Sequence, residues 1–287
     1  MRTVRTIGDL RRTLAAFRPQ RTVGFVPTMG AWHDGHLALI RASRREGCVT
    51  VASIFVNPTQ FDDPGDLAAY PRDEARDARM ALDEGVDVLF LPSVDEMYPR
   101  GFATWVDIAG AANGLEGDLR PGHFRGVATV CLKLFASVTP DVAFFGQKDA
   151  QQAAVVEQLV RDFNLPLEIR VVPTVRDADS LALSSRNVRL SPEERQRALA
   201  IPRALGVGLA AHLVGQDPVD SARAVLSEAD IDVEYVSLAD FSGRLALAIA
   251  ARVGGTRLID NVRLDDEVTP RRPPGHFGME VSELEHV

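Results

Sequence analysis

The chain has 287 residues, a length that suggests one large or two moderate domains. It is 46% hydrophobic and 25% charged, an ordinary globular mix, and its formal net charge of −8 argues against nucleic acid or an anionic membrane surface as a partner. No apolar run approaches the roughly 20 residues that span a bilayer, and no apolar signal segment follows the basic N-terminus, so we expect a cytoplasmic protein.

The first predicted helix covers residues 6–17, with Thr6 as its N-cap, because apolar residues recur there at helical spacing. Residues 23–26 form an apolar run typical of a buried strand. A loop rich in glycine and proline follows at 27–35, and a second helix is expected from residue 37. This order of strand, glycine loop and helix is the first candidate binding site in the chain.

His33 and His36 stand at the start of that second helix, three residues apart, so their rings can share one side of the turn. Backbone N–H groups at a helix start lack helical partners and attract anions such as phosphate. Gly30 and Gly35 would leave room for a phosphate beside the backbone. The loop resembles the His-x-Gly-His signature of the adenylyl-transferring α/β superfamily. The alternatives are a surface feature or half of a metal site.

The next part of the chain alternates strands and helices. Strands are expected at 49–56, 86–91, 105–108 (a short edge strand), 141–145 and 167–172, and helices at 73–84, 127–138 and 153–163. This alternation predicts an α/β fold: a Rossmann-like parallel sheet with helices on both faces. Because the carboxyl ends of parallel strands meet at one edge, we expect the loops at 27–36, 57–60 and 146–152 to converge there.

The composition and the order of predicted elements change after residue 175. A polar, turn-rich segment at 176–187 leads to a helix that starts at Ser191 and runs to about residue 212, and a second helix covers 219–228. Strands are expected at 233–239, 245–253 and 256–262, with Gly254 and Gly255 as a hairpin turn. We therefore predict two domains: residues 1–175, and a smaller α+β lid at 176–287 whose tail is loose after about 265. Cys48 and Cys131 lie in apolar runs and are expected to be buried free thiols.

Four basic side chains from these segments suit a polyphosphate: His33, His36, Lys148 and Arg186. Such groups stabilise the charge that grows on a leaving pyrophosphate. Two alternatives stay open from the residues alone. Lys148 and Asp149 could form an ordinary ion pair, and the segment 184–186 could be a capping turn.

Several motifs together resemble the pantothenate synthetase family, the pantoate–β-alanine ligases. They are PTMGAWHDGHL at 27–37, FVNPTQF at 55–61, YPR at 70–72, HFRGV at 123–127, FGQKDAQQ at 145–152 and LSSRN at 183–187. They occur in the family's order and spacing, and the match runs from about residue 22 to residue 262. The resemblance implies an ATP-dependent ligase that joins pantoate to β-alanine through pantoyl adenylate, with AMP and diphosphate as products.

The resemblance also implies roles for individual residues, and a homodimer. The catalytic set is His36, as acid or base, with His33, Lys148 and Arg186. The ATP-binding set is Met29, Gly30, Ala31, Trp32, His33, Asp34, Gly35, His36, Gly146, Gln147, Lys148, Asp149, Val175, Leu183, Ser184, Ser185 and Arg186. The set for pantoate and β-alanine is Gln60, Gln152, Asn57, Arg120 and His123. Family members use Mg²⁺ with ATP, and Asp77 is one candidate ligand for it.

The sequence departs from the family pattern at three positions. Ser180 replaces a usual glycine, which would be costly if that turn needs a positive φ. Trp32 replaces a usual leucine, a change expected to alter packing only, and Arg189 replaces a frequent aromatic residue. Two rival functions remain: a nucleotidyltransferase that passes AMP to a phosphorylated acceptor, and a non-catalytic nucleotide-binding protein on the same scaffold.

Overall fold

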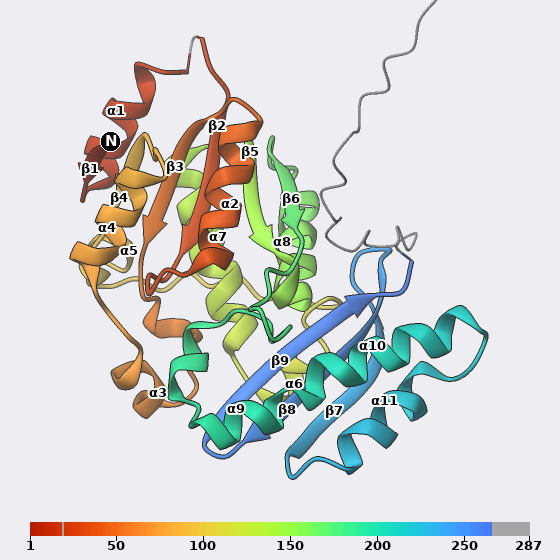
Figure 1. Ribbon diagram of the computed structural model, residues 1–287. Coiled ribbons are helices and arrows are strands. Elements are labelled where there is room, and N and C mark those ends of the chain that lie inside the picture. Colours follow the sequence, from red (N-terminus) through yellow and green to blue (C-terminus); the bar gives the residue numbers. More distant parts are fainter. Residues whose placement is uncertain (19, 266–287) are drawn as a thin grey trace, which may run out of the picture.

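The computed structural model describes residues 1–18 and 20–265, which form two sheets with their covering helices (Figure 1). Within these residues the larger sheet has six strands, all parallel, in the order β1-β4-β3-β2-β5-β6. They are β1 (Arg2–Val4), β2 (Val23–Thr28), β3 (Val49–Ile54), β4 (Val88–Phe90), β5 (Val142–Gly146) and β6 (Glu168–Val172). The predicted Rossmann-like parallel sheet is confirmed, and β1 is an edge strand that the sequence did not predict.

The connections of this sheet are mainly helical. They are α1 (Ile7–Ala15), α2 (Asp34–Arg45), α3 (Pro64–Ala69), α4 (Glu74–Asp83), α5 (Val94–Met97), α6 (Glu116–Leu119), α7 (His123–Val138) and α8 (Ala150–Asp162), with short 3₁₀ turns η1 (Pro58–Gln60) and η2 (Gln147–Asp149). The predicted cap of α1 is confirmed, because the Thr6 side chain accepts a hydrogen bond from the Asp9 N–H. Helix α7 begins at His123, four residues before the predicted start at 127.

Helices cover both faces of the sheet because its side chains alternate between the faces. Phe25 on β2 belongs to a core cluster with α1, α7 and α8, whereas its neighbour Val26 packs with α2 and α4. Val51 and Ala52 on β3 divide between the two clusters in the same way. Two apolar layers therefore fix the sheet in place, and the loops at its carboxyl edge start from a rigid base.

The second unit is a small antiparallel sheet in the order β7-β8-β9 (Figure 1). Its elements are η3 (Ser185–Arg189), α9 (Pro192–Ala198), α10 (Ala200–Leu213), α11 (Pro218–Ser227), β7 (Asp232–Asp240), β8 (Leu245–Val253) and β9 (Thr256–Arg263). On β8, Leu247 packs against the covering helices, and Ala248 packs on the other face with Ala150 and Ala154 of α8. The small sheet is thus held against the larger unit. The hairpin predicted at Gly254 and Gly255 is confirmed; the predicted loose tail after about 265 lies outside the described residues.

Two sequence predictions need correction. Residues 105–108 form no strand; instead Val106 donates its N–H to the Thr129 hydroxyl of α7, and Trp105 packs on Tyr98 and Phe102. The predicted helix from 191 to 212 is divided at Leu199, where Pro202 has no N–H to continue the ladder. The inward side of α4 carries Asp77 and Ala81, with Ala78 packed partly against the same core, whereas Leu82 is 57% exposed.

Both cysteines are buried and free, as predicted. None of the helices in the described part of the chain has the length and apolar character that a membrane crossing requires.

Candidate functional site

The sheet order creates a crevice between β2 and β5. These strands are neighbours, but the chain leaves β2 toward β3 on one side and leaves β5 toward β6 on the other. Their following loops therefore diverge, which is where open α/β sheets bind ligands. A cavity of about 240 Å³, the inner cavity, lies there and is lined by residues from both loops and from the second unit.

Most of the predicted site residues line the inner cavity. They are Met29, His33, Gly35, His36, Asn57, Gln60, Arg120, His123, Gly146, Lys148, Asp149, Gln152, Val175, Leu183, Ser184, Ser185 and Arg186. The three loops and the segment at 183–186 thus meet as expected from the sheet topology. Apolar side chains, among them Phe55, Val127 and Phe144, complete the lining.

Five predicted ATP-binding residues do not line this cavity: Gly30, Ala31, Trp32, Asp34 and Gln147. Trp32 is 1% exposed and lies in the core beside α2. Its Nε1–H donates to the Thr28 hydroxyl at 2.8 Å, so Trp32 contributes a polar contact as well as packing. Gln147 turns away and donates to Asn261 of β9 at 2.8 Å. The Trp32 and Gln147 side chains thus support the site from outside it.

The two histidines cap the helix that carries them. His33 is the N-cap of α2, and its Nδ1 accepts the Gly35 N–H at 3.2 Å. His36 Nδ1 accepts the His33 N–H at 3.3 Å. A Cβ on Gly35 would lie 2.8 Å from the His33 ring, so glycine is what allows this ring position. Because each Nδ1 accepts a hydrogen bond, each proton resides on Nε2.

These caps change the expected chemistry of the loop. Two N–H groups that were expected to bind an anion are instead occupied by the rings, and the Nε2–H groups become the available donors. Burial and the nearby positive charge of Lys148 lower the pKa of His33 to about 4. Burial and the neighbouring His33 lower the pKa of His36 to about 3. Both rings are therefore neutral hydrogen-bond donors at pH 7, not the cations that the sequence suggested.

The amide of Gln60 has a fixed orientation. Asn57 Nδ2 donates to Gln60 Oε1 at 2.9 Å, and Asn57 Oδ1 accepts from the hydroxyls of Thr59 at 2.9 Å and Tyr98 at 2.8 Å. The Thr59 backbone N–H donates to Asn57 Oδ1, and Asn57 Nδ2 donates to the Gly126 carbonyl at 3.2 Å, so these two contacts identify the ends of the Asn57 amide. Asn57 Nδ2 in turn identifies the oxygen of Gln60. Gln60 is left with its Nε2 hydrogens as free donors. The Asn57 side chain is 1% exposed and acts through Gln60.

A second pair, Arg120 and His123, lies near the same loop. His123 Nδ1 is 2.8 Å from the Gln60 carbonyl, to which it donates, and its Nε2 accepts from Arg120 Nη1 at 3.2 Å. Burial and the Arg120 charge lower the pKa of His123 to about 4. With both ring nitrogens engaged, His123 holds Arg120 beside the cavity and is a poor candidate for proton transfer.

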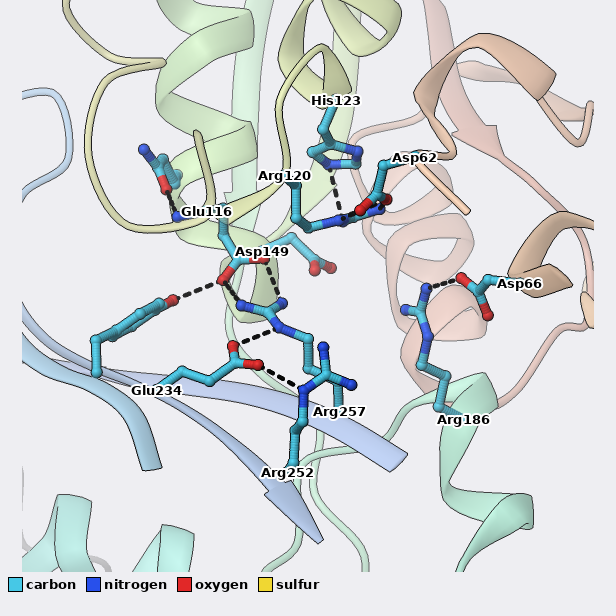
Figure 2. Close-up of polar contacts among 12 residues, drawn as sticks. Asp62, Asp66, Glu116, Arg120, His123, Asp149, Arg186, Glu234, Arg252 and Arg257 are labelled. Carbon is cyan, nitrogen blue, oxygen red and sulfur yellow. Dashed lines mark hydrogen bonds and ion pairs between the residues drawn. The ribbon is translucent and has the colours of Figure 1, made fainter. Parts of the chain in front are cut away.

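A second cavity, the outer cavity, of about 480 Å³ adjoins the inner one, and both share the residues Arg120, Lys148, Asp149, Ser184 and Arg186. Figure 2 shows the charged pairs around it. Arg186 donates to Asp66 of α3 at 2.9 Å, and Arg189 donates to the same carboxylate at 3.1 Å. The Asp66–Arg186 contact crosses from the first unit to the second.

A further charged cluster clamps the two units together (Figure 2). The Glu116 carboxylate of α6 accepts two hydrogen bonds from Arg257 of β9, at 2.6 and 2.7 Å, and one from the Tyr235 hydroxyl at 2.9 Å. Glu234 bridges Arg257 and Arg252. Burial alone would raise the pKa of Glu116, but Arg257 outweighs it and holds the pKa below its usual value.

Sequence reasoning missed several residues that contribute to this region. Asp66, Tyr98, Glu116 and Asn261 act through contacts distant in sequence; Asn261, for example, donates to the carbonyl oxygens of Gln147 and Lys148. Thr174 lines the inner cavity with a buried hydroxyl that has no partner among the described residues. Its position two residues after the end of β6 was the one available signal, since polar residues after parallel strands lie at the ligand edge.

The described residues contain no group of three or more His, Cys, Asp or Glu side chains that could hold a metal by themselves. Asp77, the candidate Mg²⁺ ligand, is 1% exposed, and both of its oxygens accept backbone N–H groups of the histidine loop. That assignment is wrong. Among the described residues Asp149 is the one carboxylate that lines the inner cavity.

Comparisons with known proteins agree along the chain. A family model described as pantoate–β-alanine ligase matches residues 2–263. Pantothenate synthetases of Moorella thermoacetica and Rhizorhabdus wittichii are 48% and 50% identical to the chain, each over 92% of it and 99% of the relative. The crystal structure of pantothenate synthetase from Thermus thermophilus is 44% identical, has a TM-score of 0.87, and is matched over 92% of this chain and 99% of its own. The pantoate–β-alanine ligase from Francisella tularensis, complexed with beta-gamma ATP and β-alanine, is 34% identical with a TM-score of 0.79 over 93% of this chain and 99% of its own.

Proposed function

The chain belongs to the pantoate–β-alanine ligase family, and from this premise we propose which of its residues carry out the reaction. It is a ligase that condenses pantoate with β-alanine at the expense of ATP. The observation that carries our residue assignments is the inner cavity itself, where His33, His36, Lys148 and Arg186 face the neutral amides of Gln60 and Gln152. The two cations, Lys148 and Arg186, and the two neutral histidine donors suit the triphosphate, and amides suit the hydroxyls and carboxylate of pantoate.

In the first step a carboxylate oxygen of pantoate attacks the α-phosphorus of ATP. The new P–O bond forms pantoyl adenylate, and the bond to the bridging oxygen breaks to release diphosphate. We assign the Nε2–H groups of His33 and His36, with Lys148, to the phosphate oxygens on which negative charge grows. A pKa of about 3 is too low for His36 to accept protons efficiently near pH 7, so we revise its expected acid–base role to hydrogen-bond donation.

We assign pantoate to the amide donors of the cavity. The fixed Nε2 hydrogens of Gln60 would donate to its carboxylate, and Gln152 would bind on the other side. The apolar side chains of the lining, such as Val127, would pack on the methyl groups of pantoate. Asn57, which was expected to bind substrate, becomes the residue that sets the direction of the Gln60 amide.

In the second step the neutral amine of β-alanine attacks the acyl carbon, an amide bond forms, the C–O bond to AMP breaks, and the nitrogen releases one proton to solvent. Arg120 is our candidate for the carboxylate of β-alanine, since His123 holds its guanidinium beside Gln60. The segment at 183–186 in the second unit would exclude water that hydrolyses the acyl adenylate. We retain residues 1–175 and 176–287 as the proposed domain division.

We propose that ATP enters as its Mg²⁺ complex. Mg²⁺ commonly keeps several waters and binds through one or two carboxylates together with substrate phosphates. Asp149 fits this role, because it lines the cavity and its side chain is 45% exposed beside Lys148. The ion would neutralise phosphate charge there. A homodimer and a cytoplasmic location also remain proposals that rest on the family; light scattering of the purified protein tests the first.

Isotope transfer tests the proposed reaction course. Pantoate labelled with ¹⁸O in its carboxylate should deliver one labelled oxygen to AMP and retain the other in pantothenate. Label in free phosphate or in diphosphate would instead indicate another activation route. A panel of phosphorylated acceptors covers the rival nucleotidyltransferase activity, and ATP binding without turnover would indicate a non-catalytic scaffold.

A further inference from the structure

A buried carboxylate lies directly behind the histidine loop. Asp77 of α4 is 1% exposed, and its Oδ2 accepts the Ala31 N–H at 2.7 Å while its Oδ1 accepts the Trp32 N–H at 3.0 Å. Arg76 is the one cation of the described residues that pairs with it, at 3.8 Å, and the Arg76 side chain is 55% exposed. A buried charge is costly unless hydrogen bonds compensate it. The loop therefore stabilises the carboxylate, and the carboxylate stabilises the loop.

The loop has an unusual conformation at this point. Gly30 and Ala31 are consecutive residues with positive φ, +86° and +54°. Glycine adopts such angles freely, but alanine does so at an energetic cost that the surroundings must offset. A Cβ on Gly30 would lie 3.0 Å from Asp77 Oδ2 and 2.9 Å from Ile54 Cγ2. The turn therefore packs closely against α4 and β3. The Asp77 carboxylate accepts hydrogen bonds from the N–H groups of Ala31 and Trp32, the two residues after Gly30.

This turn connects two stretches of chain that line the inner cavity. Met29 lines the cavity before it and His33 lines the cavity after it, while Gly30, Ala31 and Trp32 do not. The direction in which the chain leaves the turn decides where His33 caps α2, and His36 hydrogen-bonds to His33. A change at Asp77 would reach both rings without touching a substrate.

We propose that Asp77 is a positioning residue, which holds the Gly30–Ala31 turn so that the His33 and His36 rings meet the transferring phosphate of ATP. This inference rests on the proposed function of the two histidines. It explains why a charged side chain occupies the buried side of α4, where an apolar residue would pack but could not bond two adjacent N–H groups.

The first test is Asp77→Asn, which keeps the shape but places an NH₂ group against one of the two N–H donors. We expect kcat for pantoate-dependent exchange of diphosphate into ATP to fall about 10- to 100-fold. The KM for pantoate should stay within about twofold of wild type, because the residues assigned to pantoate lie on other loops. Asp73→Asn is the matched control. Asp73 caps the same helix through the Arg76 N–H, and asparagine caps equally well, so activity should stay near wild type.

The second test is suppression by Ala31→Gly in the Asp77→Asn background. Glycine adopts positive φ without strain, so the turn needs less support and at least a fivefold recovery of kcat is expected. A carboxylate that merely stabilises α4 would give no such recovery. Should Asp77→Asn fail to fold, Ala31→Val strains the same turn from the other side and should lower kcat in the same way, again with KM for pantoate unchanged.

Trp32 gives a readout that does not depend on activity. It is buried beside the Asp77 carboxylate, and Trp105 is the one other tryptophan in the sequence. In a Trp105→Phe background, Asp77→Asn should shift the Trp32 emission to longer wavelength, and Ala31→Gly should reverse the shift. The inference is overturned if Asp77→Asn leaves both the Trp32 emission and kcat at their wild-type values. It is also overturned if Asp77→Asn lowers kcat and the added Ala31→Gly substitution does not restore it. Absence of pantoate-dependent exchange in the wild type would instead overturn the proposed function.

Discussion

Arg186 of η3 and Asp66 of α3 form an ion pair at 2.9 Å that joins the second unit to the first. The guanidinium that lines the inner cavity is therefore already bound to a carboxylate. Arg189 shares that carboxylate at 3.1 Å and donates to the Ala69 carbonyl. A phosphate group that recruits Arg186 must compete with Asp66.

Removing this competitor should strengthen ATP binding. The Asp66 and Arg186 side chains are 24% and 30% exposed, and ion pairs with such exposure are worth up to about 1 kcal/mol. We expect Asp66→Asn to lower the dissociation constant for ATP by about two- to fivefold in calorimetry. Asp63→Asn is the control, because Asp63 caps α3 through the Gly65 N–H and asparagine preserves that cap. Weaker ATP binding in Asp66→Asn would show that the carboxylate orients Arg186 and does not compete for it.

The half-buried His33 and His36 should make stability depend on pH. Folding lowers the pKa of His33 to about 4 and of His36 to about 3 from an ordinary 6.5. Their neutral forms are favoured in the native state, so this contribution is complete above about pH 6.5 and is lost as the pH falls toward 4 and 3. Urea unfolding should show a steep loss of unfolding free energy between pH 6.5 and 4.

His36→Asn serves as the comparison, since asparagine can accept the His33 N–H but does not titrate. Its loss of unfolding free energy over the same pH range should be smaller than that of the wild type. Equal losses in the two proteins would mean that His36 is not held neutral by the fold.

The direction of the Gln60 amide should control pantoate binding. In Asn57→Asp a carboxylate replaces the donor that bonds Gln60 Oε1, so the Gln60 amide should reverse and present its oxygen to the pantoate carboxylate. We expect KM for pantoate to rise about 10- to 100-fold with KM for ATP nearly unchanged. Tyr98→Phe should cost less than about threefold, because Thr59 still donates to Asn57. A pantoate KM near wild type in Asn57→Asp would contradict the fixed amide.

Ser180 is strained in its turn. Its φ is +74°, in the left-handed region that glycine adopts freely, and the Ser180 N–H donates to the Asp177 carbonyl at 2.9 Å to close the turn. Ser180→Gly should relieve roughly 1–2 kcal/mol of strain, against roughly 0.4–1 kcal/mol of extra disorder in the unfolded chain. Calorimetric melting should show a rise of about 2 °C. A lower melting temperature would mean that the Ser180 side chain contributes a contact of its own.

Local patterns predicted the parallel sheet and its ligand edge. The strand at 23–26, the glycine loop and the helix start could be read from adjacent residues, and strand topology then brought Gln60 and Lys148 to the same edge. Residues 105–108 were misread because their aromatic and β-branched composition reflects packing against α7, not strand pairing.

The partners of the site residues could not be predicted. Asp77 bonds a loop 45 residues earlier in the chain, and Asp66 bonds Arg186 120 residues later. Nothing local distinguishes such carboxylates from solvated charges on a helix. The neutral state of His33 and His36 could not be predicted either, because it depends on the burial of the two rings and on their proximity to Lys148 and to each other in the folded chain.

Exchange of labelled diphosphate into ATP tests the central claim most directly, because it reports the first step alone. The wild-type protein should catalyse exchange with pantoate and Mg²⁺ present and β-alanine absent, and His36→Ala should reduce the rate about 100-fold or more. Exchange that needs β-alanine, exchange that proceeds without pantoate, or wild-type exchange in His36→Ala would contradict adenylation in the inner cavity.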